Sequence, residues 1–133
     1  MQEVSVIIPN FNGMAYLDGV LAGLECQTVD DLEVILVDNG SSDGSCAFVA
    51  ARYPWVHLIE LPENFGFCKA VNEGIRASRS PYVLLLNNDI EVTDNFIEEM
   101  TDAIKRHPKA FSCAARMIQF HDRDRLDDAG NYY

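Results

Sequence analysis

Short apolar runs and helical patterns alternate along the whole of this chain. Four runs have the length and branched side chains of buried strands, namely residues 3–8, 33–37, 56–61 and 82–86. Apolar residues recur at helical spacing between and after these runs, at residues 17–24, 47–53, 67–75 and 96–104. Strands that alternate with helices of this size form right-handed βαβ units. We therefore predict an α/β fold with a three-layer, Rossmann-like, mostly parallel sheet.

Local signals set the expected ends of two helices and the structure of the last third of the chain. Ser42 or Asp43 is expected to cap the second helix, and Thr93 or Asp94 the fourth. Residues 110–118 form a candidate fifth strand, and the charged residues that follow are expected to form an irregular tail. No repeat, low-complexity tract or linker divides the sequence, so its 133 residues are expected to form one domain.

Composition narrows the class of protein. The hydrophobic fraction of 48% and the charged fraction of 23% are ordinary for a globular protein. No apolar stretch approaches the ~20 residues that cross a bilayer, and no signal peptide is expected before the first strand. The four cysteines are widely separated, which disfavours structural zinc and favours reduced thiols in a cytoplasmic protein.

The charge balance excludes one class of partner and constrains another. A formal net charge of −11 argues against nucleic-acid binding, which needs clustered Lys and Arg. The same charge repels any phosphate-bearing ligand. A divalent cation held by a carboxylate would overcome this repulsion locally.

Two of the apolar runs end abruptly in oxygen-rich residues. The run at 33–37 leads into residues 38–45 (DNGSSDGS), and the run at 82–86 leads into Asn87-Asn88-Asp89. In an open parallel sheet, ligands bind just beyond the carboxyl ends of the strands. Both segments are therefore placed where a ligand would lie. Turn formation alone is the other explanation for each segment, because Asp, Asn, Gly and Ser are typical turn residues.

Known nucleotide-binding signatures are absent, and a signalling domain fits only in part. The first strand is followed by residues 9–13 (PNFNG) in place of a dinucleotide-binding GxGxxG, and no Walker A loop occurs. In a phosphoacceptor signalling domain, Asp38 would close a strand and Lys69 would be its basic partner. Such a domain would need acidic residues after the first strand, where this chain has Asn10 and Asn12.

Four segments in sequence order resemble the inverting glycosyltransferases of family 2, which have the GT-A fold. The segments are residues 6–12 (VIIPNFN), 36–45 (LVDNGSSDGS), 63–75 (ENFGFCKAVNEGI) and 84–89 (LLLNND). The resemblance covers essentially the whole chain. It implies that residues 1–133 are the N-terminal, nucleotide-sugar-binding part of such an enzyme, truncated on the acceptor side. It also implies a metal-dependent, inverting transfer from a UDP- or dTDP-sugar to an acceptor hydroxyl.

Two side chains are candidates for recognition of the base. Phe11 follows the first strand and would stack on a pyrimidine, and the family usually has an aromatic residue at this position. A core or hinge aromatic is the alternative for this ring. Asp38 would accept a hydrogen bond from the ring N–H and so select uracil or thymine over cytosine. Capping of the next helix is the alternative for Asp38, although Ser42 and Asp43 lie closer to that helix.

The resemblance places Asn87-Asn88-Asp89 on the DxD metal motif of the family. Asp89 would bind Mn²⁺ or Mg²⁺ that bridges the diphosphate, because these hard cations prefer oxygen ligands and retain waters. Asn88 would face the ribose. Asn87 replaces the first carboxylate of the motif, so we expect weak metal binding in the absence of nucleotide.

The remaining site residues implied by the resemblance are Pro9, Asn39, Gly66, Lys69 and Asn72. Asn39 would shape the loop after the second strand. Lys69 and Asn72, at the start of the third helix, would approach the diphosphate or the sugar. A solvated surface cation is the alternative for Lys69.

No catalytic base can be assigned from the sequence. Asp127 and Asp128 resemble a stretch that lines the sugar pocket in the family, and neither is assigned as the base. We therefore expect the chain to bind donor nucleotide and to transfer little or no sugar by itself. A nucleotide-binding module without transfer activity is the main alternative function, followed by the signalling domain.

The expected partners follow from the same resemblance. They are a nucleotide-diphosphate sugar and a glycan or lipid-linked acceptor in bacterial surface polysaccharide synthesis, with rhamnose or galactofuranose as the sugar suggested. Peripheral membrane association would come through regions outside this chain. Sugar, acceptor and oligomeric state are not fixed by the sequence.

Overall fold

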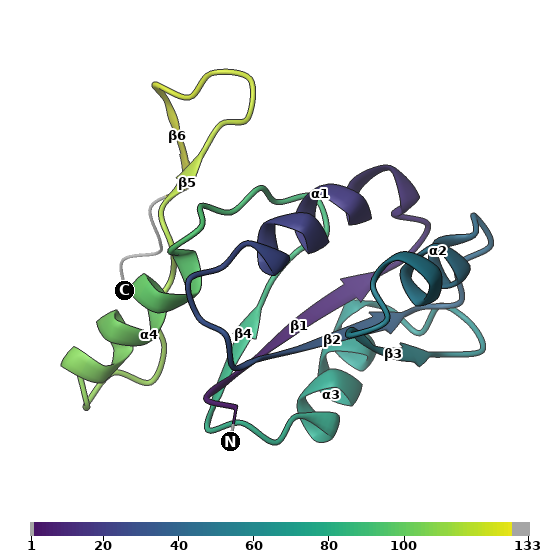
Figure 1. The fold of residues 1–133 in the computed structure, drawn as a ribbon, viewed down its shortest axis with the longest axis horizontal. Coiled ribbons are helices and arrows are strands. Elements are labelled where there is room, and N and C mark those ends of the chain that lie inside the picture. The colour runs from purple at the N-terminus through teal and green to yellow at the C-terminus, as the bar shows by residue number, and fades with distance from the viewer. Residues whose placement is uncertain (1, 129–133) are drawn as a thin grey trace.

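The computed structural model describes residues 2–128, so Met1 and the segment 129–133 of the expected domain lie outside the described residues. Four parallel strands form one sheet in the order β3-β2-β1-β4 (Figure 1). They are β1 (Val4–Asn10), β2 (Leu32–Asp38), β3 (His57–Glu60) and β4 (Tyr82–Leu85). The predicted α/β fold with a parallel sheet is confirmed.

Helices cover both faces of the sheet and complete three layers (Figure 1). The helices are α1 (Met14–Glu25), α2 (Ser45–Arg52), α3 (Phe67–Ala77) and α4 (Phe96–Arg106). Because successive strand residues point to opposite faces, β1 splits its apolar side chains between two cores. Val6 and Ile8 pack in one core with residues of α1, α2 and α4, whereas Ile7 packs in the other with Ala70 of α3.

A glycine allows α3 to lie close to the sheet. A Cβ atom added at Gly74 would lie 2.4 Å from Cγ2 of Ile7 and 3.2 Å from Cγ2 of Val37. The missing side chain therefore lets α3 approach β1 and β2. This contact fixes where the first turn of α3 stands beside the ends of the strands.

The strand register brings the polar segments to one edge of the sheet. Asn10 lies opposite Asp38, and Asp38 lies opposite Glu60, so β1, β2 and β3 end at the same level. On the other side of β1, the backbone N–H of Leu86 donates to the carbonyl of Ile7 at 3.0 Å. The residues that follow β1, β2 and β4 consequently meet at the carboxyl end of the sheet.

One edge of the sheet is formed by β4, which pairs only with β1 among the described residues. Val83 and Leu85 point to the face that α3 covers farther along the sheet, and they are 41% and 50% exposed. Ile75 of α3 is 43% exposed. The edge strand therefore presents apolar side chains to solvent.

The prediction of a fifth strand at residues 110–118 is largely wrong. Only Met117–Ile118 forms a strand, β5, which pairs antiparallel with β6 (Leu126–Asp128) of the expected irregular tail. The resulting hairpin projects away from the sheet (Figure 1). Residues 110–116 have no strand partner, and the Phe111 side chain is fully exposed. An apolar run without a neighbouring strand cannot satisfy its backbone groups in a ladder.

Both predicted helix caps lie one or two residues too early. Gly44 occupies the cap position of α2 with a φ of 88°, a left-handed conformation that glycine adopts without strain. The Asp43 carboxylate nevertheless accepts a hydrogen bond from the backbone N–H of Ser45 at 3.0 Å. Asn95 holds the cap position of α4, and the N–H of Ile97 donates to the Gln27 side chain at 2.9 Å.

Candidate functional site

A chain of side-chain hydrogen bonds connects the ends of three strands. Asn10, the last residue of β1, donates from Nδ2 to Oδ1 of Asp38 at 2.8 Å. Its own Oδ1 accepts a hydrogen bond from Nδ2 of Asn88 at 2.9 Å. The register explains the first contact, because Asn10 and Asp38 are lateral neighbours on the same face of the sheet. Residues that follow β4, β1 and β2 are thus joined at the edge where ligands bind in open parallel sheets.

The Asp38 carboxylate is buried and already has several donors. Its exposed fraction is 1%, and Ser41 donates to it twice, from the backbone N–H at 2.8 Å and from Oγ at 2.6 Å. With the bond from Asn10, the two oxygens accept three hydrogen bonds. A carboxylate has about four acceptor positions, so one more donor can be accommodated. The two hydrogen bonds from Ser41 close a local turn around the Asp38 carboxylate, so Asp38 does not cap α2.

A protonated thiol lies beside this carboxylate. Burial is the main cause that raises the pKa of Cys46, in the first turn of α2, to about 12, and a hydrogen bond and charge repulsion from Asp38 add to it. The carboxylate of Glu60 raises the pKa of this thiol further. Cys46 therefore remains neutral at pH 7 and interacts with Asp38 as a weak donor.

Asn39 and Gly66 hold two loops together at the end of β2. Asn39 is 4% exposed; its Nδ2 donates to the carbonyl of Gly66 at 3.2 Å, and its Oδ1 accepts from the N–H of Phe65 at 3.4 Å. Gly40 has a φ of 73°, and a Cβ atom there would lie 2.7 Å from Cα of Glu63. Both the conformation and the close approach require glycine. Asn39 thus shapes the loop, as expected, with both ends of its amide engaged.

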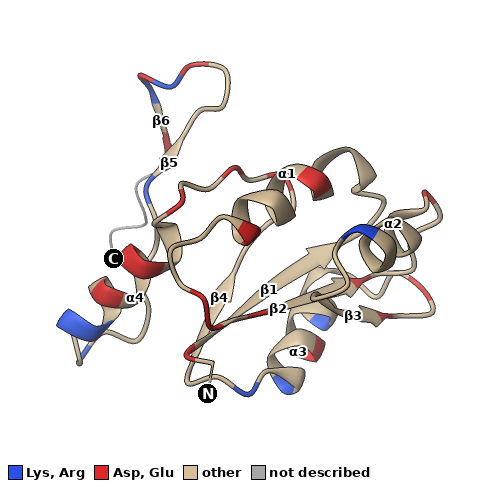
Figure 2. Ribbon diagram, viewed as in Figure 1, with Lys and Arg blue, Asp and Glu red and all other residues tan. Residues whose placement is uncertain are grey.

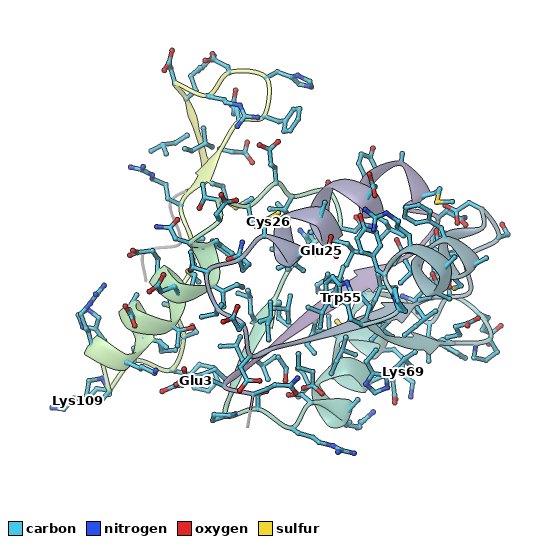
Figure 3. All side chains as sticks on the ribbon, viewed as in Figure 1. Glu3, Glu25, Cys26, Trp55, Lys69 and Lys109 are labelled. Carbon is cyan, nitrogen blue, oxygen red and sulfur yellow. The ribbon has the colours of Figure 1, made fainter. Side chains whose placement is uncertain are left out.

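The predicted ligand-facing residues differ in how accessible they are. The Phe11 ring is 49% exposed and is not part of either core, whereas Pro9 is half-buried. Asn72 is exposed on α3. Lys69, also exposed on α3 (Figure 3), forms an ion pair with Glu73 at 2.9 Å. The four strands and α1 carry no Lys or Arg (Figure 2), whereas Lys69 lies in the first turn of α3.

The metal motif offers one carboxylate. Asn87 and Asp89 are exposed, and Asn88 is half-buried through its bond to Asn10. Among the side chains of residues 2–127, no three His, Cys, Asp or Glu are grouped so as to hold a metal ion. This arrangement suits a cation that takes most of its ligands from phosphate oxygens and water, as Mg²⁺ commonly does. It does not suit a cage built only from protein ligands.

Two cavities lie away from this edge. One of about 310 Å³ lies between β4, α4 and residues 111–113, and one of about 320 Å³ is lined by α4 and the starts of β1 and β2. Neither is lined by a predicted site residue. The chemistry points to the carboxyl end of the sheet, where polar side chains converge. None of the described helices is long and apolar enough to cross a membrane.

Asn10, Ser41 and Gly13 belong to the hydrogen-bonded edge and were not predicted as site residues. Asn10 is the last residue of its strand, two residues beyond the predicted strand end, and only the observed register places it beside Asp38. Ser41 lies three residues after Asp38, a spacing typical of a turn in which a carboxylate accepts from the backbone. No sequence signal distinguishes Gly13 from a simple loop glycine.

Comparison with known proteins identifies the family. The sequence model described as glycosyl transferase family 2 matches residues 5–131. The chain belongs to this glycosyltransferase family. The resemblance seen in the four sequence segments is thereby confirmed.

Relatives of this family 2 chain include bacterial glycosyltransferases. An N-acetylglucosaminyl-diphospho-decaprenol L-rhamnosyltransferase from Mycobacterium tuberculosis is 30% identical over 116 residues, which cover 79% of this chain and 38% of the relative. A cholesterol galactosyltransferase from Borreliella burgdorferi is 29% identical over 121 residues, which cover 89% of this chain and 34% of the relative. The chain therefore spans about a third of the length of these relatives.

Solved structures share the fold of this family 2 chain. The Staphylococcus aureus protein TarS 1–349, solved in complex with UDP, superposes with a TM-score of 0.72 at 24% identity, covering 80% of this chain and 33% of that chain. The mannosyltransferase PcManGT from Pyrobaculum calidifontis, solved with GDP-Man and Mn²⁺, gives a TM-score of 0.63 at 29% identity, covering 67% of this chain and 28% of that chain.

Proposed function

We propose that this chain is the nucleotide-sugar-binding part of a glycosyltransferase that moves a sugar from a UDP- or dTDP-sugar to an acceptor hydroxyl with inversion. The observation that carries this proposal is the convergence of Phe11, Asp38 and Asp89 on the carboxyl ends of β1, β2 and β4. The exposed ring of Phe11 suits stacking on the base, and the buried carboxylate of Asp38 suits the ring N–H of the base. The exposed carboxylate of Asp89 suits a metal ion bound to the diphosphate. Family membership supports the same assignment.

Base recognition would combine stacking with one hydrogen bond. The exposed face of Phe11 is available for a pyrimidine, and base stacking on an aromatic ring contributes ~1–3 kcal/mol. The N3–H of uracil or thymine would replace the Cys46 thiol, a weak donor, at the fourth acceptor position of Asp38. Cytosine has no hydrogen at this nitrogen, so the carboxylate would discriminate against it. Because Asp38 is 1% exposed, the base would have to reach it along the edge formed by Asn10 and Ser41.

The diphosphate would be held by a metal ion and by α3. Asp89 would be the protein ligand of Mn²⁺ or Mg²⁺, with phosphate and water oxygens filling the other positions. When bound, such a cation supplies Lewis-acid stabilisation of the departing diphosphate. Lys69 in the first turn of α3 and Asn72 in the second would approach the phosphates or the sugar, which requires Lys69 to exchange Glu73 for the ligand.

The acceptor is proposed to be a glycan or a lipid-linked sugar of a bacterial surface polysaccharide, and the reaction is proposed to take place in the cytoplasm. The rhamnosyltransferase relative, which is named for a decaprenol-linked sugar, supports this class. Asp127 is exposed on the β5–β6 hairpin, and we do not assign it as the catalytic base. The signalling-domain alternative is set aside, because the whole chain matches family 2.

Calorimetric titration of UDP and CDP, with and without Mn²⁺, tests the proposal. Asp38→Ala should weaken UDP binding by ~1–3 kcal/mol, since the base N–H loses its acceptor. Asp89→Asn should abolish the enhancement of UDP binding by Mn²⁺ without affecting folding. Asp102→Asn, on the exposed side of α4, is the matched control and should bind like the wild-type chain.

Two results would contradict the proposal. One is an unchanged UDP affinity in a folded Asp38→Ala variant, which would remove the base-reading role. The other is a retained Mn²⁺ enhancement in folded Asp89→Asn, which would remove the metal role.

A further inference from the structure

Asn10 lies at the centre of the hydrogen-bonded edge without facing the solvent. It is 1% exposed, so a ligand in the crevice would meet its neighbours first. Its Nδ2 donates to Asp38 at 2.8 Å and lies 3.4 Å from Oγ of Ser41, while its Oδ1 accepts from Asn88. Every polar atom of this side chain is therefore used inside the protein.

The charge of Asp38 fixes the direction of this chain of hydrogen bonds. A carboxylate only accepts, so the amide of Asn10 must turn its Nδ2 to Asp38 and its Oδ1 to Asn88. Asn88 must then turn its own Nδ2 inward. Its Oδ1 has no hydrogen-bond partner among the side chains of residues 2–127, and it remains available to accept from a ligand hydroxyl. The orientation of Asn88 thus depends on Asp38 through Asn10.

Gly13 provides the space for this arrangement. A Cβ atom at this buried glycine would lie 2.1 Å from Nδ2 of Asn88 and 2.3 Å from Oδ1 of Asn10. Its φ of −97° is open to any residue, so backbone conformation does not require glycine here. The close packing against the two amides does. A methyl group added at Gly13 would push Asn10 and Asn88 apart without removing any polar group from the protein.

We propose that Asn10 is a positioning residue that couples recognition of the base at Asp38 to binding of the ribose and metal at Asn88 and Asp89. This inference rests on the proposed function and adds a specific dependence to it. If Asn10 only held the strand ends together, its loss would weaken all nucleotides equally. If Asn10 couples the two parts of the site, its loss should lower both the preference for UDP over CDP and the enhancement of UDP binding by Mn²⁺.

The test compares Asn10→Ala and Gly13→Ala with Gly19→Ala, which adds a methyl group to α1 where nothing lies within 4 Å. UDP and CDP are titrated by calorimetry with and without Mn²⁺, and folding is checked by circular dichroism. In both test variants we expect the UDP-over-CDP preference to drop about tenfold, a size usual for coupled hydrogen-bonded neighbours. The Mn²⁺ enhancement should drop several-fold, again on the order expected for such coupling. Gly19→Ala should retain both.

The outcomes separate this inference from the function on which it rests. A wild-type chain that does not distinguish UDP from CDP would overturn the proposed function and the coupling with it. A wild-type chain that does so, together with a folded Gly13→Ala variant that keeps both the preference and the Mn²⁺ enhancement, would overturn the coupling alone. An equal loss of UDP and CDP affinity would also overturn it. If Asn10→Ala does not fold, Gly13→Ala decides the question, because it removes no polar group.

Discussion

Replacement of Asp38 by asparagine should destabilise the fold even in the absence of any ligand. The substitution keeps the shape of the side chain but replaces one acceptor oxygen by an NH₂ group. The best orientation keeps the carbonyl oxygen at the Oδ1 position, where Asn10 and the Ser41 hydroxyl donate. The new amide then faces the backbone N–H of Ser41, which loses its acceptor at 2.8 Å. Two donors would point at each other in the turn.

The size of the effect follows from this geometry. A donor left without a partner costs ~1–3 kcal/mol, and the half-buried position of Ser41 favours the lower half of that range. The two remaining bonds also weaken, because they no longer end on a charged oxygen. We therefore expect the free energy of unfolding to fall by about 2 kcal/mol. With a urea m-value of ~2 kcal/mol/M, the unfolding midpoint should fall by ~1 M.

Urea unfolding at neutral pH, followed by circular dichroism and by the fluorescence of the single tryptophan, Trp55, measures this change. Asp89→Asn is the matched control: it removes the same charge from an exposed side chain, and it should change the free energy of unfolding by no more than ~0.5 kcal/mol. Equal midpoints for the two variants would refute the reasoning, because they would show that Asp38 stabilises nothing through Asn10 and Ser41.

Two further predictions concern packing and pH. Gly74→Ala should be less stable than Gly19→Ala by ~1–3 kcal/mol in urea unfolding, because its methyl group would lie 2.4 Å from Ile7. The two variants gain the same helix propensity, so the difference measures the packing alone. Equal stabilities would show that α3 can move away from β1 without cost. Stability should fall as the pH rises from about 9 towards 12, because folding raises the pKa of Cys46 from 9.0 to about 12 and that of Tyr53 from 10.0 to about 12, so the unfolded chain releases these protons first. Urea midpoints across this range should decline less steeply in Cys46→Ala, and an identical decline would contradict the assigned pKa.

The sequence was sufficient for the sheet and for the sheet edge at which the candidate site residues lie. Buried parallel strands have uniform apolar runs, so β1, β2 and β4 could be predicted, and strand ends are where ligands bind. Phe11 and Asp38 therefore lie at the predicted edge. The contacts made by Asn10 could not be predicted, because they depend on the register between strands and on which way an amide turns. Neither the strand register nor the orientation of an amide produces a periodic pattern in a single sequence.

The wrong fifth strand has a related cause. An apolar segment forms a strand only when another strand is available to pair with it. Residues 110–116 have strand-like composition, but the described chain offers them no paired neighbour. Hydrophobic pattern reports local preference, whereas strand formation at this position depends on a long-range partner.

The exposed apolar side of β4 has a practical consequence for handling the isolated chain. An edge strand with unpaired backbone groups and exposed apolar side chains such as Val83 and Leu85 is a template for pairing between molecules. The net charge of −11 opposes that contact by repulsion between copies. Salt shortens the reach of this repulsion to about 10 Å at 0.1 M and about 3 Å at 1 M. Dilute, low-salt buffers should therefore keep the molecules apart, and concentrated salt should promote self-association through the sheet edge.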